Sequence, residues 1–382
     1  MNLKFNSDGE FKILLFGDIH ECGDYKASPN FKDMQKMMSA ALDEFNPDLC
    51  VLLGDNCHGG VYKNEGAEKF KEMVSDLIAP MTRRGIPVAA IMGNHEHDHG
   101  IDDEIVAVYN SIDGCIMRND APEITGAANY KELIYSSDGE KPAFCLWFID
   151  SNNLCEDREL SNYDYVHTDQ IEWFENESAK LREANAGKPL PSFVFQHIPV
   201  PEEYRLLRKA KPWEIPVAVR GHNKKSKNFY VLKDGASGYL GEGPCAPDYN
   251  NGQFESWKKT GGVLGAFFGH DHLNDFSGKV DGILLAQHKT AGFRAYTDGC
   301  RCGVRLVTVY ENNPENFTHE FKHFKEFGLK CECLGPVFKR ITDRQSINLT
   351  VGSRIAAGAA AVICAGIAFK KIKGGKFGGQ KG

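Results

Sequence analysis

Apolar runs that end in polar residues alternate with helical patterns, and this alternation constrains the fold more than any other feature. The first three runs are FKILLFGDIH, PDLCVLLGDN and IPVAAIMGNHEH. Between them, residues 31–45 place apolar side chains at helical spacing, and a second helical pattern ends at Gly85. Continuous apolar runs separated by helices are typical of buried strands in an α/β fold.

The second half of the chain adds further strand patterns. They are NYKELIYSS and PAFCLWFIDS, which we expect to be adjacent, then LPSFVFQHIPV, TGGVLGAFFGHDH, GILLAQHKT and CGVRLVTVYE. Thr168 is a favourable N-cap for a helix over DQIEWFENESAKLREAN. Residues 212–251 are rich in Gly, Pro, Asn and Lys, which predicts a long connection that shapes a binding pocket.

Composition narrows the class of protein. The chain has 382 residues, enough for a large domain with a substantial core. Its net charge of −7 argues against a general nucleic-acid binder. The twelve cysteines are scattered and no secretion signal is visible, so we expect free thiols in a reducing, cytoplasmic compartment.

The end of the chain differs from the rest, and we predict a catalytic domain over residues 1–345 followed by a tail over 346–382. The tail contains no Asp or Glu, and 15 uncharged residues separate Arg354 from Lys370. As a helix this run spans about 22 Å, whereas a bilayer core is about 30 Å thick. Snorkelling of the flanking cations closes that gap, so a membrane-associated helix and a surface or Gly/Lys-rich tail are both open interpretations.

Five of the apolar runs end in residues of the kinds that bind metal ions: Asp18 and His20, Asp55, Asn94, His197, and finally His270 and His272. In open α/β sheets the carboxyl ends of the strands line one crevice, so these side chains can meet. Carboxylate, imidazole and amide groups together suit Mn, Fe or Zn. The set is too large for one ion, which predicts two ions bridged by one carboxylate.

The blocks GDIH, GDN, GNHE, QH and GHDH resemble, in this order, the signature blocks of the calcineurin-like metallophosphoesterases. The resemblance covers about residues 11–310. The segment GHDHLNDFSG, with NNGQFESW before it and CGVRLV after it, resembles the branch related to the purple acid phosphatases. This likeness implies a four-layer α/β/β/α sandwich with a dinuclear metal site.

The resemblance also implies a role for each residue. Asp18, His20 and His272 would hold one metal, Asn94, His197 and His270 the other, and Asp55 would bridge both. His95, catalytic together with Asp55, would protonate the leaving group or stabilise the transition state. Purple enzymes carry a tyrosine where this chain has His58, so we expect a colourless site of unassigned metal identity, with His58 as a substrate contact.

These features predict a hydrolase that cleaves a small phosphorylated substrate by attack of a metal-bound hydroxide, in the first place a phosphomonoesterase. Two alternatives stay open. One is a phosphodiesterase acting on a cyclic nucleotide or a lipid headgroup, and the other is a non-catalytic binding scaffold.

Three further features have more than one interpretation. His97 and His99 are solvated loop residues or contacts to substrate or carboxylates. Two C-x-C pairs, at residues 300–302 and 331–333, suit free thiols or a structural zinc ion. The basic stretch over residues 205–227 is a solvated loop or attracts an anionic substrate.

Overall fold

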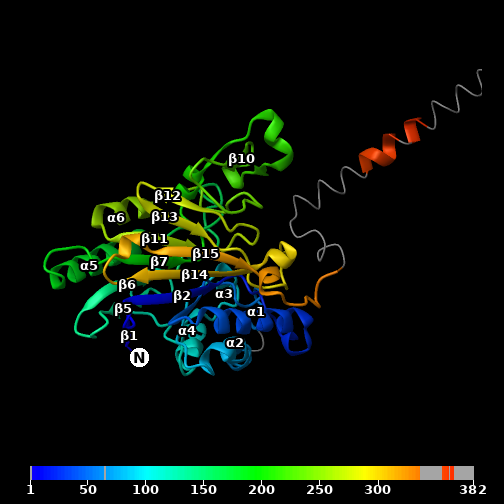
Figure 1. The fold of residues 1–382 in the computed structure, drawn as a ribbon. Helices are drawn as coiled ribbons and strands as arrows, with labels where there is room; N and C mark the ends of the chain where they lie inside the picture. The colour runs from blue at the N-terminus through cyan, green and yellow to red at the C-terminus, as the bar shows by residue number, and fades with distance from the viewer. Residues whose placement is uncertain (1, 64–65, 336–354, 361, 365–382) are drawn as a thin grey trace, which may run out of the picture.

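The computed structural model describes residues 2–63, 66–335, 355–360 and 362–364. Two mixed β-sheets face each other, and helices cover the outer face of each (Figure 1). This arrangement confirms the predicted four-layer α/β/β/α sandwich.

The five-stranded sheet has the order β15-β14-β2-β3-β4. Its strands are β2 (Glu10–Phe16), β3 (Leu49–Leu52), β4 (Val88–Ala90), β14 (Gly303–Tyr310) and β15 (Thr318–His323). The first three run parallel, as expected for apolar runs joined by helices, and β14 pairs antiparallel with β2. The helices of this half are α1 (Pro29–Phe45), α2 (Gly66–Thr82), α3 (Asn94–His97) and α4 (Asp102–Asn110).

The seven-stranded sheet has the order β1-β5-β6-β7-β11-β13-β12. Its strands are β1 (Leu3–Lys4), β5 (Tyr130–Tyr135), β6 (Pro142–Phe148), β7 (Ser192–Gln196), β11 (Val263–Phe268), β12 (Ser277–Val280) and β13 (Ile283–Gln287). The expected neighbours β5 and β6 pair antiparallel. Helices α5 (Thr168–Ala184) and α6 (Gln253–Thr260) lie on its outer face.

Alternation along the strands of the larger sheet divides its side chains between two cores. Phe193 and Phe195 of β7 belong to the core shared with the five-stranded sheet, whereas Val194 packs with Phe174 of α5 and Trp257 of α6. Both faces are therefore buried, which explains why these strands read as continuous apolar runs.

Helix termini follow local sequence. Pro29 opens α1, and the Ser28 hydroxyl accepts the Asn30 N–H at 3.1 Å. The predicted N-cap at Thr168 is wrong by one residue, because His167 is the cap and Thr168 is already helical. The Gln170 side chain accepts the His167 N–H at 2.9 Å, which fixes the start of α5 one residue earlier.

Part of the predicted long connection is ordered as a small antiparallel sheet. Its strands are β8 (Leu207–Lys209), β9 (Val219–Arg220) and β10 (Phe229–Leu232), and the 3-10 helices η3 (Pro212–Val217) and η4 (Asn223–Lys225) join them. These strands have two to four residues, too few for a periodicity to be recognised in the sequence. The small sheet stands out from the body of the molecule (Figure 1).

Most of the predicted tail over residues 346–382 lies outside the described residues, so the division at residue 345 stays a prediction. Residues 355–360 and 362–364 are described and helical. Across the described ranges of the chain, we find no helix with both the length and the apolar character needed to cross a bilayer.

Candidate metal centre

The seven residues predicted as metal ligands are all buried and converge at one edge of the two sheets. They follow β2, β3 and β4 in the smaller sheet and β7 and β11 in the larger one. The carboxyl ends of strands from both sheets therefore meet at this edge. Their role as metal ligands stays a prediction, and the distances between them define what kind of ion they can hold.

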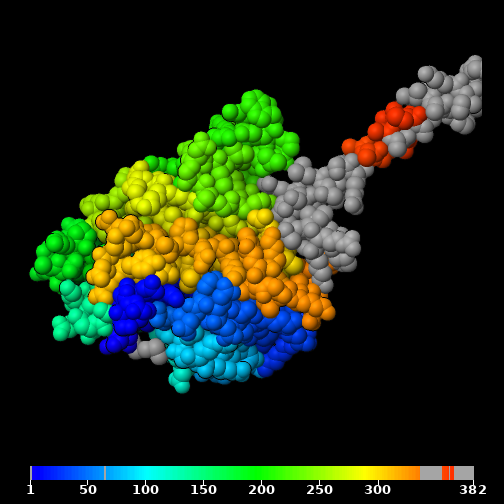
Figure 2. Space-filling model, in the orientation of Figure 1, coloured from blue at the N-terminus to red at the C-terminus, as the bar shows by residue number. Residues whose placement is uncertain are grey.

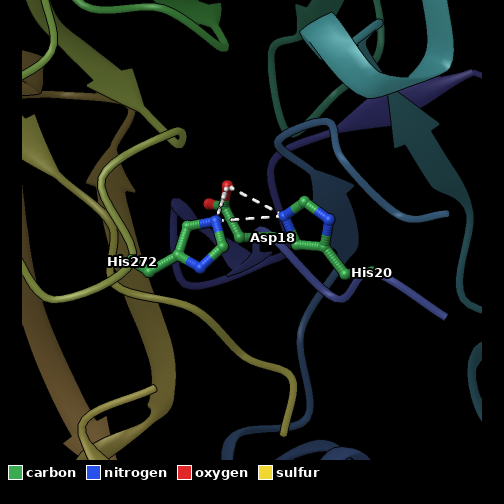
Figure 3. Close-up of side chains that lie close together, drawn as sticks. All are labelled: Asp18, His20 and His272. Carbon is green, nitrogen blue, oxygen red and sulfur yellow. Dashed lines mark hydrogen bonds and ion pairs between the residues drawn. The ribbon is translucent and has the colours of Figure 1, made fainter. Parts of the chain in front are cut away.

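The first group contains Asp18, His20 and His272 (Figure 3). The His20 and His272 Nε2 atoms face each other at 3.0 Å, and His272 Nε2 lies 3.6 Å from the Asp18 carboxylate. Ligand atoms of all three lie within 4.8 Å of one another. The group thus offers one carboxylate and two imidazoles to a single cation.

The second group contains Asp55, His197 and His270, with Asn94 beside it. His197 Nε2 lies 3.2 Å from Asp55 Oδ2 and 3.2 Å from Asn94 Oδ1. The same Asp55 oxygen is 3.5 Å from His20 Nε2 in the first group. Asp55 therefore lies between the two groups, where a bridging carboxylate is required.

Backbone carbonyls orient two of the imidazoles. His197 Nδ1 lies 2.7 Å from the Leu53 carbonyl, and His272 Nδ1 lies 3.0 Å from the Tyr296 carbonyl. Because a carbonyl only accepts, each Nδ1 must carry a proton. The Nε2 lone pairs then point into the site, which is the arrangement that metal-binding histidines adopt.

The protonation states of the four imidazoles also fit the binding of cations. Burial lowers the pKa of His20 and His270 well below its usual value, and it lowers the pKa of His272 to about 4. These rings are therefore neutral at pH 7 and offer lone pairs. Burial opposes the charged form of His197 as well, yet the Asp55 carboxylate raises the pKa of His197 to about 10. That negative charge favours a cation just as it favours a proton.

Unsatisfied polar atoms point to the same conclusion. Within the described residues, His20 Nδ1 and His270 Nε2 are buried without a hydrogen-bond partner. Such atoms are costly in an apolar interior. The donor set, its burial and the orphaned His270 nitrogen fit a pair of metal ions. His20 faces the site with its Nε2, so its orphaned Nδ1 is not a ligand atom.

The backbone at the site is strained. Asp18, His20, Asp55 and His270 have positive φ values of 54°, 54°, 52° and 75°. Few residues other than glycine adopt this conformation, and it concentrates at functional sites. Each of the four ligands is thereby aimed by a sharp turn directly after its strand.

Glu96 is a structural support that the sequence did not reveal. Its buried carboxylate accepts the N–H groups of Gly93, Asp55 and Asn56 at 2.8, 2.7 and 2.8 Å. Asp55 in turn accepts the His95 N–H at 2.8 Å. Glu96 therefore ties the turn after β3 to the turn after β4 and fixes the position of Asp55.

His95, the predicted general acid, lies at the solvent-facing side of the site with 37% of its side chain exposed. Its Nδ1 lies 2.7 Å from Asp98 Oδ2, and Asn153 donates to the other oxygen of Asp98 at 3.1 Å. Asp98 was not predicted, although its spacing of three residues after His95 was a usable signal. A Cβ at Gly59 would lie 2.4 Å from His95 Nδ1, so only glycine fits beside this pair.

The neighbouring histidines differ from one another. His58 is exposed, and its ring stacks against His95 with centroids 6.2 Å apart. Its predicted contact with substrate stays a prediction. The interpretation of His97 and His99 as solvated residues is wrong. His97 pairs with the carboxylates of Asp150 and Asp102 at 2.9 Å each. His99 is fully buried.

The carboxylates beside His97 determine its charge. Burial opposes protonation, but the carboxylates of Asp150 and Asp102 raise the pKa of His97 well above its usual value. His97 is therefore a buried cation that joins α3 to the end of β6.

Aromatic side chains line the rim of the site. The Tyr296 ring stacks on His272 with centroids 4.1 Å apart, and Tyr163 contacts His270 edge-on at 4.3 Å. His222, in the turn after β9, stacks on Tyr163 at 5.7 Å. The small sheet thus reaches the rim of the metal centre, and nothing in the sequence pattern indicated these contacts.

The two C-x-C pairs do not form a second site of comparable quality. Cys331 and Cys333 have Sγ atoms 3.7 Å apart, with Asp33 nearby. However, the Asp33 carboxylate already binds Lys36 and the N–H groups of residues 332 and 333. Its oxygens therefore act as a cap for this turn.

Comparison with known proteins supports the geometry. A family model described as calcineurin-like phosphoesterase matches residues 11–274. The chain is 28% identical to a probable inactive purple acid phosphatase 14 from Arabidopsis thaliana, over 77% of this chain and 73% of that protein. It is 26% identical to Phosphatase DCR2 from Saccharomyces cerevisiae, over 84% of this chain and 54% of that protein.

A solved structure of a dimetal phosphatase from Danio rerio has the same fold, with a TM-score of 0.50 at 12% identity. The match covers 82% of this chain and 96% of that one. The family model spans the turns after β2, β3, β4, β7 and β11, where the buried ligand groups converge. The chain belongs to the calcineurin-like metallophosphoesterases, in the branch related to the purple acid phosphatases.

Proposed function

We propose that the chain is a dinuclear metal-dependent phosphomonoesterase. One observation carries the proposal: two buried groups of metal-binding side chains share the Asp55 carboxylate. Two cations held there would neutralise charge on a phosphate and would activate a water molecule as nucleophile. The names of the relatives, purple acid phosphatase and phosphatase, favour a monoester substrate.

The side chains around the cations have separate tasks. Asp55, tied to Glu96 through the backbone, holds its position between the two groups. Asp98 accepts the Nδ1 proton of His95, so the opposite nitrogen of the ring is the one that protonates the departing alcohol. Because His95 is partly exposed, the ester enters from solvent and its leaving group departs on that side.

The proposal is tested with purified protein, a chromogenic phosphomonoester and the matching diester, after loading with manganese, iron or zinc. We expect about two equivalents of metal, faster turnover of the monoester, and loss of turnover in His95→Ala without loss of metal. Faster turnover of the diester would assign the alternative phosphodiesterase function instead.

A non-catalytic scaffold is the second candidate, because relatives carry the words "probable inactive" in their names. Every predicted ligand and His95 are nevertheless present in this chain. Metal analysis separates the two functions: a scaffold binds no stoichiometric metal and hydrolyses neither ester.

The predicted cytoplasmic location rests on the cysteines, all twelve of which are free. Association of the tail with a membrane is tested by fractionating cells that express the full chain or a version ending at Gly352. If the tail adds to membrane binding, the full chain should be enriched in the membrane fraction relative to the shortened version.

A further inference from the structure

Exposed hydrophobic side chains gather on the small projecting sheet and its connections, residues 207–233, which we call the projection. Between residues 2 and 335, seven large hydrophobic residues are exposed, and four of them belong to the projection. Trp213 is 73% exposed in η3, followed there by Ile215 and Val217, and Phe229 is exposed in β10. Concentrated apolar exposure of this kind marks an interaction surface.

The same projection is strongly basic in a chain that is acidic overall. Residues 207–233 contain eight Lys or Arg and a single acidic residue, Glu214. Arg208 already neutralises Glu214 through two contacts of 2.7 Å, and the Lys211 N–H donates to the same carboxylate at 2.7 Å. These bonds hold η3 in shape, so the apolar residues are presented in a fixed arrangement.

Six basic residues of this surface are exposed, and in the described part of the chain none of them has an ion pair with a carboxylate. They are Lys209, Lys211, Arg220, Lys224, Lys227 and Lys233. The ammonium of Lys211 lies over the Trp213 ring, 5.4 Å from its centroid. At least one of these cations therefore lies directly against the exposed apolar residues.

The shape of the projection narrows the choice of partner. It stands out from the body as a convex feature (Figure 2). A nucleic-acid backbone would neutralise the cations but offers no apolar medium for Trp213, Ile215 and Val217. The interface of an anionic bilayer offers both, because tryptophan partitions to the headgroup level and lysines bind acidic lipids.

We propose that the projection docks onto an anionic phospholipid surface. Trp213, Ile215 and Val217 enter the headgroup region, and the surrounding lysines bind lipid charges. This inference is independent of catalysis, because none of these residues belongs to the metal centre, and it concerns a segment separate from the tail.

The experiment is sedimentation of the full chain with phosphatidylcholine vesicles, with and without phosphatidylserine. We expect binding only to the anionic vesicles, weakened by salt. Trp213→Ala should weaken binding about tenfold. Lys209→Gln, Lys211→Gln and Lys227→Gln together should weaken it roughly a hundredfold.

The matched control replaces by glutamine three other exposed lysines that form no ion pair within the described residues, namely Lys4, Lys141 and Lys188. It changes the net charge equally, at residues outside the projection, and should bind as the unmodified chain does. Turnover of a soluble ester should be the same in all variants.

Several results would overturn the proposal. The chain could bind neutral vesicles as tightly as anionic ones, or bind neither. The control variant could lose as much affinity as the projection variants. The projection variants could also bind as tightly as the unmodified chain, which would assign any membrane affinity to another segment. Slower turnover of the soluble ester with intact vesicle binding would show that the lysines attract substrate instead. Binding of the projection to an acidic protein, together with no binding to vesicles, would show that this protein is its partner.

Discussion

Replacement of Gly59 by alanine should reduce turnover without removing any functional group. The added Cβ would lie 2.4 Å from His95 Nδ1 and 2.5 Å from Asp98 Oδ2. The His95 ring and the Asp98 carboxylate would therefore have to retreat by about 1 Å to reach ordinary contact distance. A displacement of that size at a catalytic group costs roughly a hundredfold in rate, or about 2.7 kcal/mol in the barrier.

The assay is kcat for a chromogenic phosphomonoester, measured together with metal content and thermal unfolding. Gly59 does not have a positive φ, so alanine fits its backbone and should leave the melting temperature nearly unchanged. Gly335→Ala is the matched control, because a Cβ there meets no atom of the described residues within 4 Å. A Gly59→Ala protein with full metal content and the original kcat would show that the His95–Asp98 arrangement does not contribute to the reaction.

Three further predictions concern Glu96, Asp98 and His288. Glu96→Gln leaves at least one of three buried N–H groups without its carboxylate, so the free energy of unfolding in urea should fall by about 2–4 kcal/mol. Asp98→Asn should lower kcat by about tenfold to a hundredfold while KM changes little, and equal kcat would refute its role. Burial lowers the pKa of His288 to about 3. Below pH 6.5 this imidazole is therefore protonated in the unfolded chain but stays neutral in the folded one. Stability should therefore fall by about 2 kcal/mol from this residue between pH 7 and 5, and His288→Gln should flatten that slope.

The layered fold and the meeting of the candidate ligands at one place could be predicted. Both follow from the alternation of apolar strands and helices along the sequence, with the ligands at the strand ends. Asp18, Asp55 and His197 each directly follow a buried apolar run. The runs alone suggested one crevice, however, and could not distinguish one sheet from two. The family resemblance supplied the sandwich, in which strands from both sheets contribute ligands.

Contacts between loops could not be predicted, because no periodicity records them. Glu96 bonds across to the turn after β3, and Gly59 makes room for a pair formed by two residues of another turn. The projection was also missed as structure, since its strands are short and its composition is that of a loop. Its exposed Trp213 became meaningful only when burial could be measured.

The residues of the metal centre also form hydrogen bonds that join the two sheets. His197 of the larger sheet donates to the Leu53 carbonyl of the smaller one, at 2.7 Å. The His270 N–H lies 3.0 Å from the Asp18 carboxylate, and Thr290 donates to the Asp18 carbonyl at 2.6 Å. The left-handed turns at Asp18 and His270 are therefore maintained by bonds that exist only when both sheets are packed together. Since the ligands cannot converge before the sandwich closes, cations must bind the packed state more tightly than any state in which the sheets have separated, and their binding stabilises that packing.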